Sequence, residues 1–66
     1  IKVKDDSKYI KKRYTIDKIP KNISLGAIIR GDRVEIPNHH SHIYPDDELL
    51  LFTKSDNVIA AERLFR

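Results

Sequence analysis

An alternating pattern of apolar residues, interrupted by a two-residue turn, constrains the fold of this chain more than any other feature. Residues 23–29 and 34–36 alternate between apolar and polar or small side chains, which is the period of strands with one buried face. Gly31-Asp32 separates the two runs and can supply the positive φ that a tight turn requires. The sequence therefore predicts a β-hairpin whose apolar positions are Ile23, Leu25, Ala27, Ile29, Val34 and Ile36.

A third strand is predicted by the run Leu49 to Phe52, which is continuously apolar and bounded by charged residues. Such a run is typical of a strand buried on both faces, and it places Leu51 in the core. Pro37 ends the second hairpin strand, and residues 38–47 form a polar loop that closes on a turn at Tyr44-Pro45-Asp46-Asp47. Together with the hairpin, this strand makes a three-stranded unit on which the remaining residues must pack.

The two ends of the chain supply a short strand and two helices. Residues 1–4 alternate apolar and charged side chains, and Asp5-Asp6-Ser7 offers N-caps for a short or broken helix over residues 8–19, which Pro20 ends. Residues 54–57 offer N-caps for an amphipathic helix that carries Val58, Ala61, Leu64 and Phe65 on one face. The predicted order is β-α-β-β-β-α, a small α+β fold.

The length of the chain implies one domain, residues 1–66, with a marginal core. The chain contains no cysteine, so neither a disulfide nor a thiolate-bound zinc ion can reinforce it, and we expect self-association to contribute stability. The chain begins at Ile1 without a methionine, and we expect it to be a fragment of a longer protein. The sequence contains neither a membrane span nor a signal peptide, and the absence of cysteine fits a cytoplasmic setting.

The charge is distributed unevenly. Residues 1–21 carry eight Lys or Arg and three acids, whereas residues 22–66 carry five and seven, which gives the net +3. A basic N-terminal part can meet phosphates or anionic lipid headgroups, or it can simply be a solvated surface. No aromatic platform accompanies the lysines, so nucleic acid is not an expected partner.

Three histidines and two arginines are the groups that most resemble a site. Imidazoles are good metal ligands, but adjacent side chains of an extended loop diverge, so His39-His40-x-His42 is interpreted as a solvated loop and no metal site is assigned. Arg30 and Arg33 flank the turn and could hold an anion, or could form an exposed hairpin tip. No nucleophile motif or glycine-rich phosphate loop is present, so the chain is not expected to be an enzyme.

An ordered set of motifs over nearly the whole chain resembles the TrkA-C domain, the C-terminal half of RCK modules that regulate potassium conductance. In chain order these motifs are Ser7, Pro20, Gly26-Ala27-Ile28-Ile29-Arg30-Gly31, Pro37, Asp47, Leu49-Leu50-Leu51-Phe52 and Glu62-Arg63-Leu64-Phe65. The chain departs from the family pattern at Asp46, where Gly is usual, and at Lys11, where Gly is frequent. The resemblance implies a cytoplasmic regulatory domain that pairs two-fold and acts on a potassium uptake system of the Trk type.

The resemblance also implies partners and a ligand-binding region. Any NAD or ATP site would belong to a neighbouring RCK nucleotide-binding half, a Rossmann domain outside this chain, and the regulated partner would be a membrane potassium transporter subunit at the inner face of the membrane. Some relatives bind a small ligand such as cyclic di-AMP at the two-fold interface, which here corresponds to Ile19–Ile23 and the loop after Pro37. The Arg–Asn arrangement of those relatives is replaced by a segment with Lys and no Arg, so this ligand is the less favoured interpretation. The candidate ligand-binding residues are Lys21, Asn22, Arg30, Arg33, His39 and His40.

Two alternative functions remain open from the sequence. The domain could be the regulatory tail of a cation–proton antiporter or another transporter, or a purely structural dimerisation module that binds no ligand.

Overall fold

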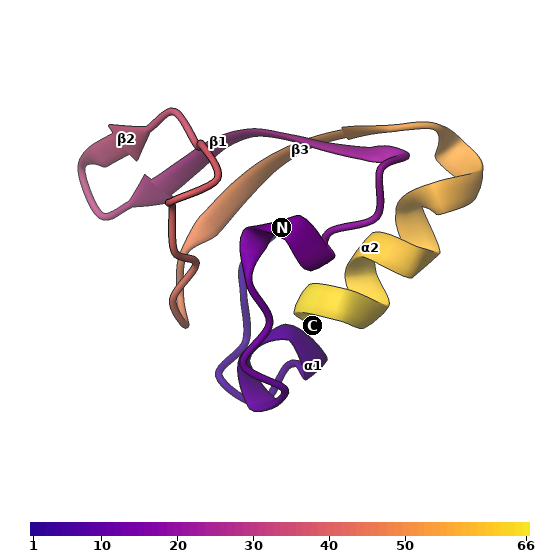
Figure 1. The fold of residues 1–66 in the computed structure, drawn as a ribbon, viewed down its shortest axis with the longest axis horizontal. Coiled ribbons are helices and arrows are strands. Elements are labelled where there is room, and N and C mark those ends of the chain that lie inside the picture. The colour runs from indigo at the N-terminus through magenta and orange to yellow at the C-terminus, as the bar shows by residue number, and fades with distance from the viewer.

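The computed structural model describes residues 1–66 as an antiparallel three-stranded sheet with both helices on one of its faces (Figure 1). The strands are β1 (Ile23–Arg30), β2 (Arg33–Glu35) and β3 (Glu48–Thr53), and their order in the sheet is β2-β1-β3. The helices are α1 (Lys8–Lys11) and α2 (Val58–Phe65). The predicted α+β class is therefore confirmed. Neither helix is long and apolar enough to cross a membrane.

The predicted hairpin is confirmed, but its second strand is short and exposed. Arg30 pairs with Arg33, so Gly31-Asp32 is the two-residue turn, and Gly31 has φ 62°. Val34 is 65% exposed and Ile36, which lies beyond the end of β2, is 74% exposed. The prediction that these two residues lie on a buried face was wrong, because no element of this chain covers them.

A bulge in β1 changes which of its residues face the core. The register with β3 shifts between Leu25 and Ala27, and beyond the shift Ile28 is fully buried while Ile29 is only half-buried. A bulge adds one residue to one strand and so moves the following side chains to the opposite face. Strict alternation along residues 23–29 was therefore the wrong expectation. A Cβ at Gly26 would lie 2.5 Å from the ring of Phe52, so a larger residue there would force that ring to move.

The third strand is confirmed in position, but only one of its faces is buried. Leu49 is 2% exposed, whereas Leu50 and Phe52 are 49% and 60% exposed, and Leu51 is half-buried at the edge of the core. The prediction of a strand buried on both faces was wrong, because both helices lie on the same side of the sheet and leave the other side open (Figure 1).

The N-terminal region follows the predicted pattern in outline. The first strand is reduced to one bridge between Lys2 and Glu48, although Val3 is fully buried as its alternation predicted. The predicted short or broken helix is confirmed: Ser7 caps α1 by accepting a hydrogen bond from the Ile10 N–H, and the 3₁₀ helix η1 (Ile16–Lys18) follows a break. At α2 the N-cap residue is Asn57, whose side chain makes no capping hydrogen bond, and the 3₁₀ helix η2 (Ser55–Asn57) precedes it.

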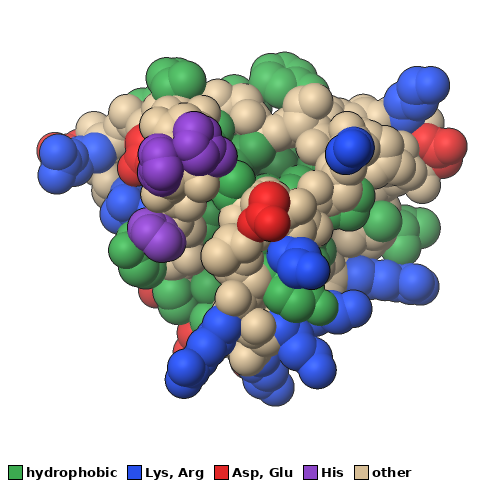
Figure 2. All heavy atoms as spheres, in the orientation of Figure 1, with side chains coloured by type: hydrophobic (Ala, Val, Ile, Leu, Met, Phe, Trp, Pro, Cys, Tyr) green, Lys and Arg blue, Asp and Glu red, His purple; other side chains and the backbone are tan.

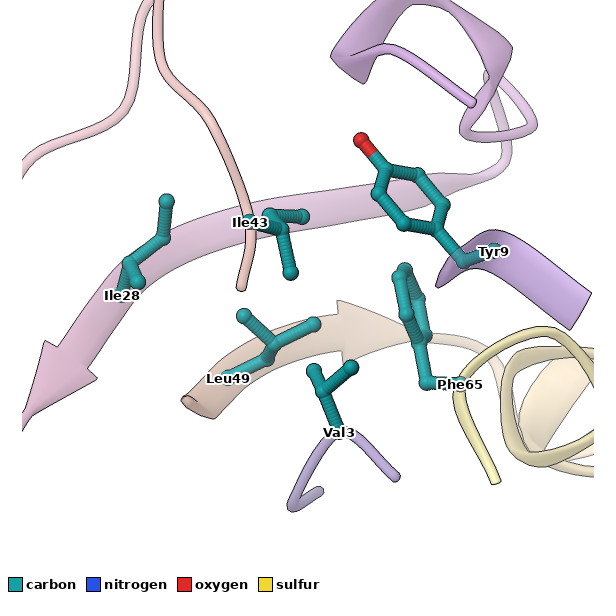
Figure 3. Close-up of a cluster of buried hydrophobic side chains, with 6 residues drawn as sticks. All are labelled: Val3, Tyr9, Ile28, Ile43, Leu49 and Phe65. Carbon is teal, nitrogen blue, oxygen red and sulfur yellow. The ribbon is translucent and has the colours of Figure 1, made fainter. Parts of the chain in front are cut away.

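The core takes one side chain each from the N-terminal segment, α1, β1, the loop before β3, β3 itself and α2 (Figure 3). Tyr9 of α1 packs against Phe65 of α2 with ring centroids 5.2 Å apart, and burial, with the nearby charge of Asp17, raises the pKa of Tyr9. Ile43 comes from a loop that the sequence indicated to be polar. The cluster consists of Val3, Tyr9, Ile28, Ile43, Leu49 and Phe65.

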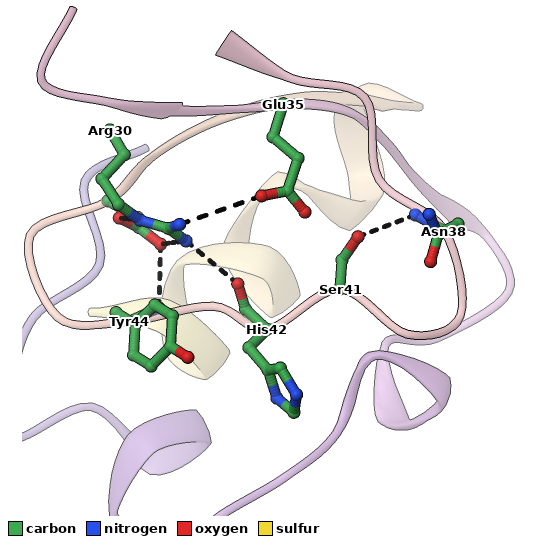
Figure 4. Close-up of polar contacts among 7 residues, drawn as sticks. Arg30, Glu35, Asn38, Ser41, His42 and Tyr44 are labelled. Carbon is green, nitrogen blue, oxygen red and sulfur yellow. Dashed lines mark hydrogen bonds and ion pairs between the residues drawn. The ribbon is translucent and has the colours of Figure 1, made fainter. Parts of the chain in front are cut away.

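Arg30 and Asp47 hold the loop of residues 36–47 against the sheet (Figure 4). Arg30 Nε donates to Asp47 Oδ1 and Nη2 donates to Oδ2, both at 2.8 Å, which is the bidentate geometry of a strong charge-assisted pair. Arg30 Nη2 also donates to the His42 carbonyl at 3.1 Å, and its guanidinium carbon lies 4.7 Å from the centroid of the Tyr44 ring. Glu35 approaches the same guanidinium at 3.8 Å. One side chain at the end of β1 thus fixes the far half of this loop.

The carboxylate of Asp47 is almost completely buried, with 2% of its side chain exposed. Burial alone would raise the pKa of Asp47, but the hydrogen bonds from Arg30 and from the Tyr44 N–H, with the charge of Arg30, outweigh it and lower the pKa. The turn before it has the predicted form: Pro45 occupies its second position, and the Asp47 N–H donates to the Tyr44 carbonyl at 3.2 Å. Asp46 has φ 72°, a left-handed conformation that favours glycine.

Replacing Leu49 should test the assignment of the core strand. We expect Leu49→Ala to lower the free energy of unfolding by about 2–5 kcal/mol, because the side chain is buried and would leave a cavity. Leu50→Ala, next to it on the open face, should cost less than about 1 kcal/mol. Urea unfolding followed by circular dichroism measures both values, and equal losses would contradict the assigned orientation of β3.

The lowered pKa of Asp47 predicts a loss of stability in acid. Its contribution is present above its unfolded-state pKa, near 3.8, and is lost as the pH falls towards the lower pKa of the folded state. Asp47→Asn should cost about 1.5–3 kcal/mol at neutral pH and should reduce the acid dependence of the melting temperature. Asp46→Asn, an exposed neighbour in a conformation that Asn tolerates, is the matched control and should leave both properties nearly unchanged.

Candidate functional site

A shallow groove of about 230 Å³ lies between the segment that leads into β1 and the start of the 36–47 loop. It is open at the surface, and four of its eight lining residues are aliphatic and two are prolines. Its eight residues are Ile16, Ile19, Pro20, Lys21, Ile23, Leu25, Pro37 and Asn38. Most of them lie in or next to the two regions, Ile19–Ile23 and the loop after Pro37, that the family resemblance implied as an interface, whereas Ile16 and Leu25 lie outside both.

The groove exists because β2 is shorter than β1. β2 pairs only with Ile28–Arg30, so the first half of β1 has no partner strand on that side. Pro37 lacks an N–H and cannot continue the ladder, and the chain leaves the sheet beyond Glu35. Pro20 on the opposite wall prevents η1 from continuing as a helix into β1. Two prolines thus keep the walls apart and leave Ile23 and Leu25 at the floor.

The polar groups of the groove are Lys21 and Asn38, both exposed. Asn38 is held in a tight turn: its N–H donates to Ser41 Oγ at 2.9 Å, and its Oδ1 accepts from the His40 N–H at 2.8 Å (Figure 4). The side chain of Lys21 is in no ion pair within the chain. A positive charge and a fixed amide therefore stand beside an apolar floor, an arrangement that fits a ligand with an anionic group on an apolar body.

The structure separates the six residues proposed from the sequence into two groups. Lys21 lines the groove and Asn22 follows it, with the Asn22 carbonyl accepting a hydrogen bond from the Thr53 hydroxyl. His39 and His40 follow Asn38 on the rim, exposed, with ring centroids 4.0 Å apart. These four lie near the groove in sequence and form the first group.

Arg30 and Arg33 form the second group and lie in a different hollow, at the hairpin end, with Ile28, Val34 and Glu35. Arg30 is committed to Asp47, and hydrogen bonding to this carboxylate raises the pKa of its guanidinium. Arg33 is exposed and forms no ion pair. Of the six residues only Lys21 lines the groove, so a ligand there would meet Lys21 rather than the two arginines, and ligand binding by any of the six stays a prediction.

The lining of the groove supplies apolar contacts, one amine and one amide. None of the eight residues has a hydroxyl, thiol, imidazole or carboxylate side chain that could act as a nucleophile or general base. No group of three or more His, Cys, Asp or Glu side chains is placed to hold a metal ion. Sequence reasoning did not single out Ile16 or Leu25, which reach the groove through the 3₁₀ helix and the bulged strand. The apolar spacing of these two residues predicted that they are buried, but such spacing does not tell a core position from one that lines a groove.

Comparison with known proteins identifies the family. The model of the TrkA-C domain matches residues 1–66, the whole chain. A curated relative, the Trk system potassium uptake protein TrkA homolog of Archaeoglobus fulgidus, is 40% identical over 48 residues, which cover 73% of this chain and 11% of the relative. The match thus spans about a tenth of the relative's length. No solved structure matches the chain. The fold, the ordered motifs and the full-length match agree, and the chain belongs to the TrkA-C domain family.

Proposed function

We propose that this domain is the regulatory, ligand-sensing and dimerising part of a potassium uptake system of the Trk type. Family membership and the potassium uptake named for the A. fulgidus relative support the system. The observation that carries the sensing role is the groove, where an apolar floor meets Lys21 and the fixed amide of Asn38. A site that binds without catalytic groups is what a regulatory domain requires.

Two copies of the domain pair through this groove in our proposal. A domain of 66 residues buries little apolar surface by itself, and a two-fold contact presents the same patch from both partners. Pro20, Lys21 and Asn38 are exposed beside half-buried Ile19 and Leu25, so a facing copy can cover apolar surface. One ligand on the two-fold axis would then contact the same lining residues of both copies. It would bind the dimer more tightly than the monomer and so stabilise the dimer.

The remaining partners in this proposal lie outside the chain. An RCK nucleotide-binding domain of the parent protein would carry any NAD or ATP site, and a membrane potassium transporter subunit would receive the signal at the cytoplasmic face. The domain itself has no catalytic role and binds no nucleic acid in this proposal. The structural dimerisation module is separated from this proposal by the ligand screen below. An antiporter tail would be separated from it by the parent protein, where membrane spans rather than a Rossmann domain would precede this chain.

Sedimentation should reveal a two-fold dimer at tens of micromolar. Pro20→Arg should dissociate it, because two added charges would face each other across the groove, whereas Leu50→Arg, on the open face of the sheet, should leave it intact. Circular dichroism confirms that both variants fold. A species of only 7.7 kDa for the unmodified chain would contradict the dimer, and dissociation by Leu50→Arg alone would place the interface on the sheet.

A thermal-shift screen tests ligand sensing. NADH and ATP should leave the melting temperature unchanged, because the chain has only two glycines and no phosphate-binding loop. A ligand at a hundredfold excess over its Kd would add about 2.7 kcal/mol, which raises the melting temperature of a domain of this size by about 10–20 °C. A shift with cyclic di-AMP that Lys21→Ala abolishes would identify the ligand class, and a zinc shift abolished by His40→Ala would assign the histidines.

The negative outcomes of this screen also decide between proposals. A large shift with NADH or ATP would contradict the assignment of those sites to another domain. An unchanged melting temperature with all four compounds would favour the structural dimerisation module, which binds no ligand.

A further inference from the structure

A second groove, of about 380 Å³, lies between the two helices on the far side of η1 from the first groove. Its charged side chains are all cations from three different elements: Lys8 of α1, Lys18 of η1 and Arg63 of α2. Between them lie Tyr14, Pro20, Ala60 and Leu64, and no acidic residue lines the groove. On most protein surfaces positive and negative side chains are interspersed, whereas this groove carries positive ones only.

The cations continue beyond the groove. Lys11, Lys12 and Arg13 follow Lys8 along and just after α1, and all three are exposed. Figure 2 shows Lys and Arg side chains gathered over the end of the molecule that carries α1 in Figure 1. The basic face therefore comprises Lys8, Lys11, Lys12, Lys18 and Arg63, together with Arg13, which lines a neighbouring hollow that shares Tyr14 with this groove.

None of these six cations takes part in an ion pair within the chain. The ion pairs involve only the N-terminal amine and Arg30, and the charge of Asp17 interacts with that of Lys18 alone among the six. Asp17, adjacent to Lys18, accepts a hydrogen bond from the Thr15 hydroxyl and does not line the groove. Asp5 and Asp6 line a different hollow. Holding six like charges together is unfavourable, so an anionic partner would stabilise the arrangement.

We propose that the basic face docks on an anionic membrane surface. Lys and Arg beside aliphatic side chains, here those of Pro20, Ala60 and Leu64, are a composition that proteins use at the boundary between headgroups and acyl chains. Juxtamembrane clusters of four to eight cations bind anionic lipid through the same electrostatic attraction. The cations occupy one end of the domain rather than a long stripe, and Tyr14 is half-buried against Tyr9, so no exposed aromatic platform is available for nucleic-acid bases.

Vesicle co-sedimentation of the 66-residue chain tests this proposal. We expect at least about tenfold stronger partitioning to phosphatidylcholine vesicles that contain about one third phosphatidylglycerol than to phosphatidylcholine alone. The binding should fall steeply as salt rises from about 0.1 M to 1 M, because the Debye length shortens from about 10 to 3 Å. Equal partitioning to both kinds of vesicle, or none to either, would overturn the proposal.

Two charge-matched double variants locate the binding face. Lys12→Glu with Arg63→Glu should reduce partitioning at least about tenfold, whereas Arg33→Glu with Lys54→Glu, which changes the net charge equally on exposed positions elsewhere, should have a much smaller effect. Circular dichroism verifies folding of both variants. Equal losses would show that net charge and not this face determines binding. Duplex DNA that displaces the chain from vesicles at matched phosphate concentration would assign the face to nucleic acid and overturn the proposal.

Discussion

The bidentate pair between Arg30 and Asp47 is the interaction on which the rest of this small structure depends. Arg30 ends the central strand, and Asp47 precedes the neighbouring strand and is buried. Their contact fixes the far half of the 36–47 loop, which carries Ile43 into the core. The Asp47 main chain also accepts a hydrogen bond from the Val3 N–H, so the N-terminal segment is attached at the same point. A chain with few buried residues thus joins three segments through one ion pair.

The same arrangement determines where the domain can bind. The loop is held at Asp47 but leaves the sheet at Pro37, and the gap that results is the groove beside Lys21 and Asn38. On the other side of η1, the two helices leave a second groove lined by cations. The open sheet face, with Leu50 and Phe52, is a third apolar surface. A regulatory domain needs separate surfaces for a second copy of itself, for a ligand and for neighbouring domains. A single sheet with helices on one side leaves such surfaces exposed.

Local chemistry made much of this fold predictable. Gly31-Asp32 favours a hairpin turn, Pro45 favours a β-turn, and Ser7 and Pro20 mark the start and the end of the first helical region. Each of these residues determines the backbone conformation of its neighbours in the sequence only. Features that depend on distant residues were not predictable. The bulge that buries Ile28 arises in the pairing of β1 with β3, more than twenty residues apart in the chain, and the burial of Asp47 depends on Arg30, seventeen residues away. The regions that line the groove were expected from the family resemblance, whereas the commitment of Arg30 to a structural pair was not.

A double-mutant cycle on Arg30 and Asp47 tests the central claim most directly. Stability is measured by urea unfolding for the unmodified chain, Arg30→Ala, Asp47→Ala and the double variant. The coupling energy of an exposed ion pair is about 0.2–1 kcal/mol. For a hydrogen-bonded pair with one buried partner we expect a coupling energy of about 2 kcal/mol or more. Such a coupling, with the amide resonances of residues 36–47 shifted in each single variant, is the result that this account predicts. Additive losses and an unperturbed loop would contradict it.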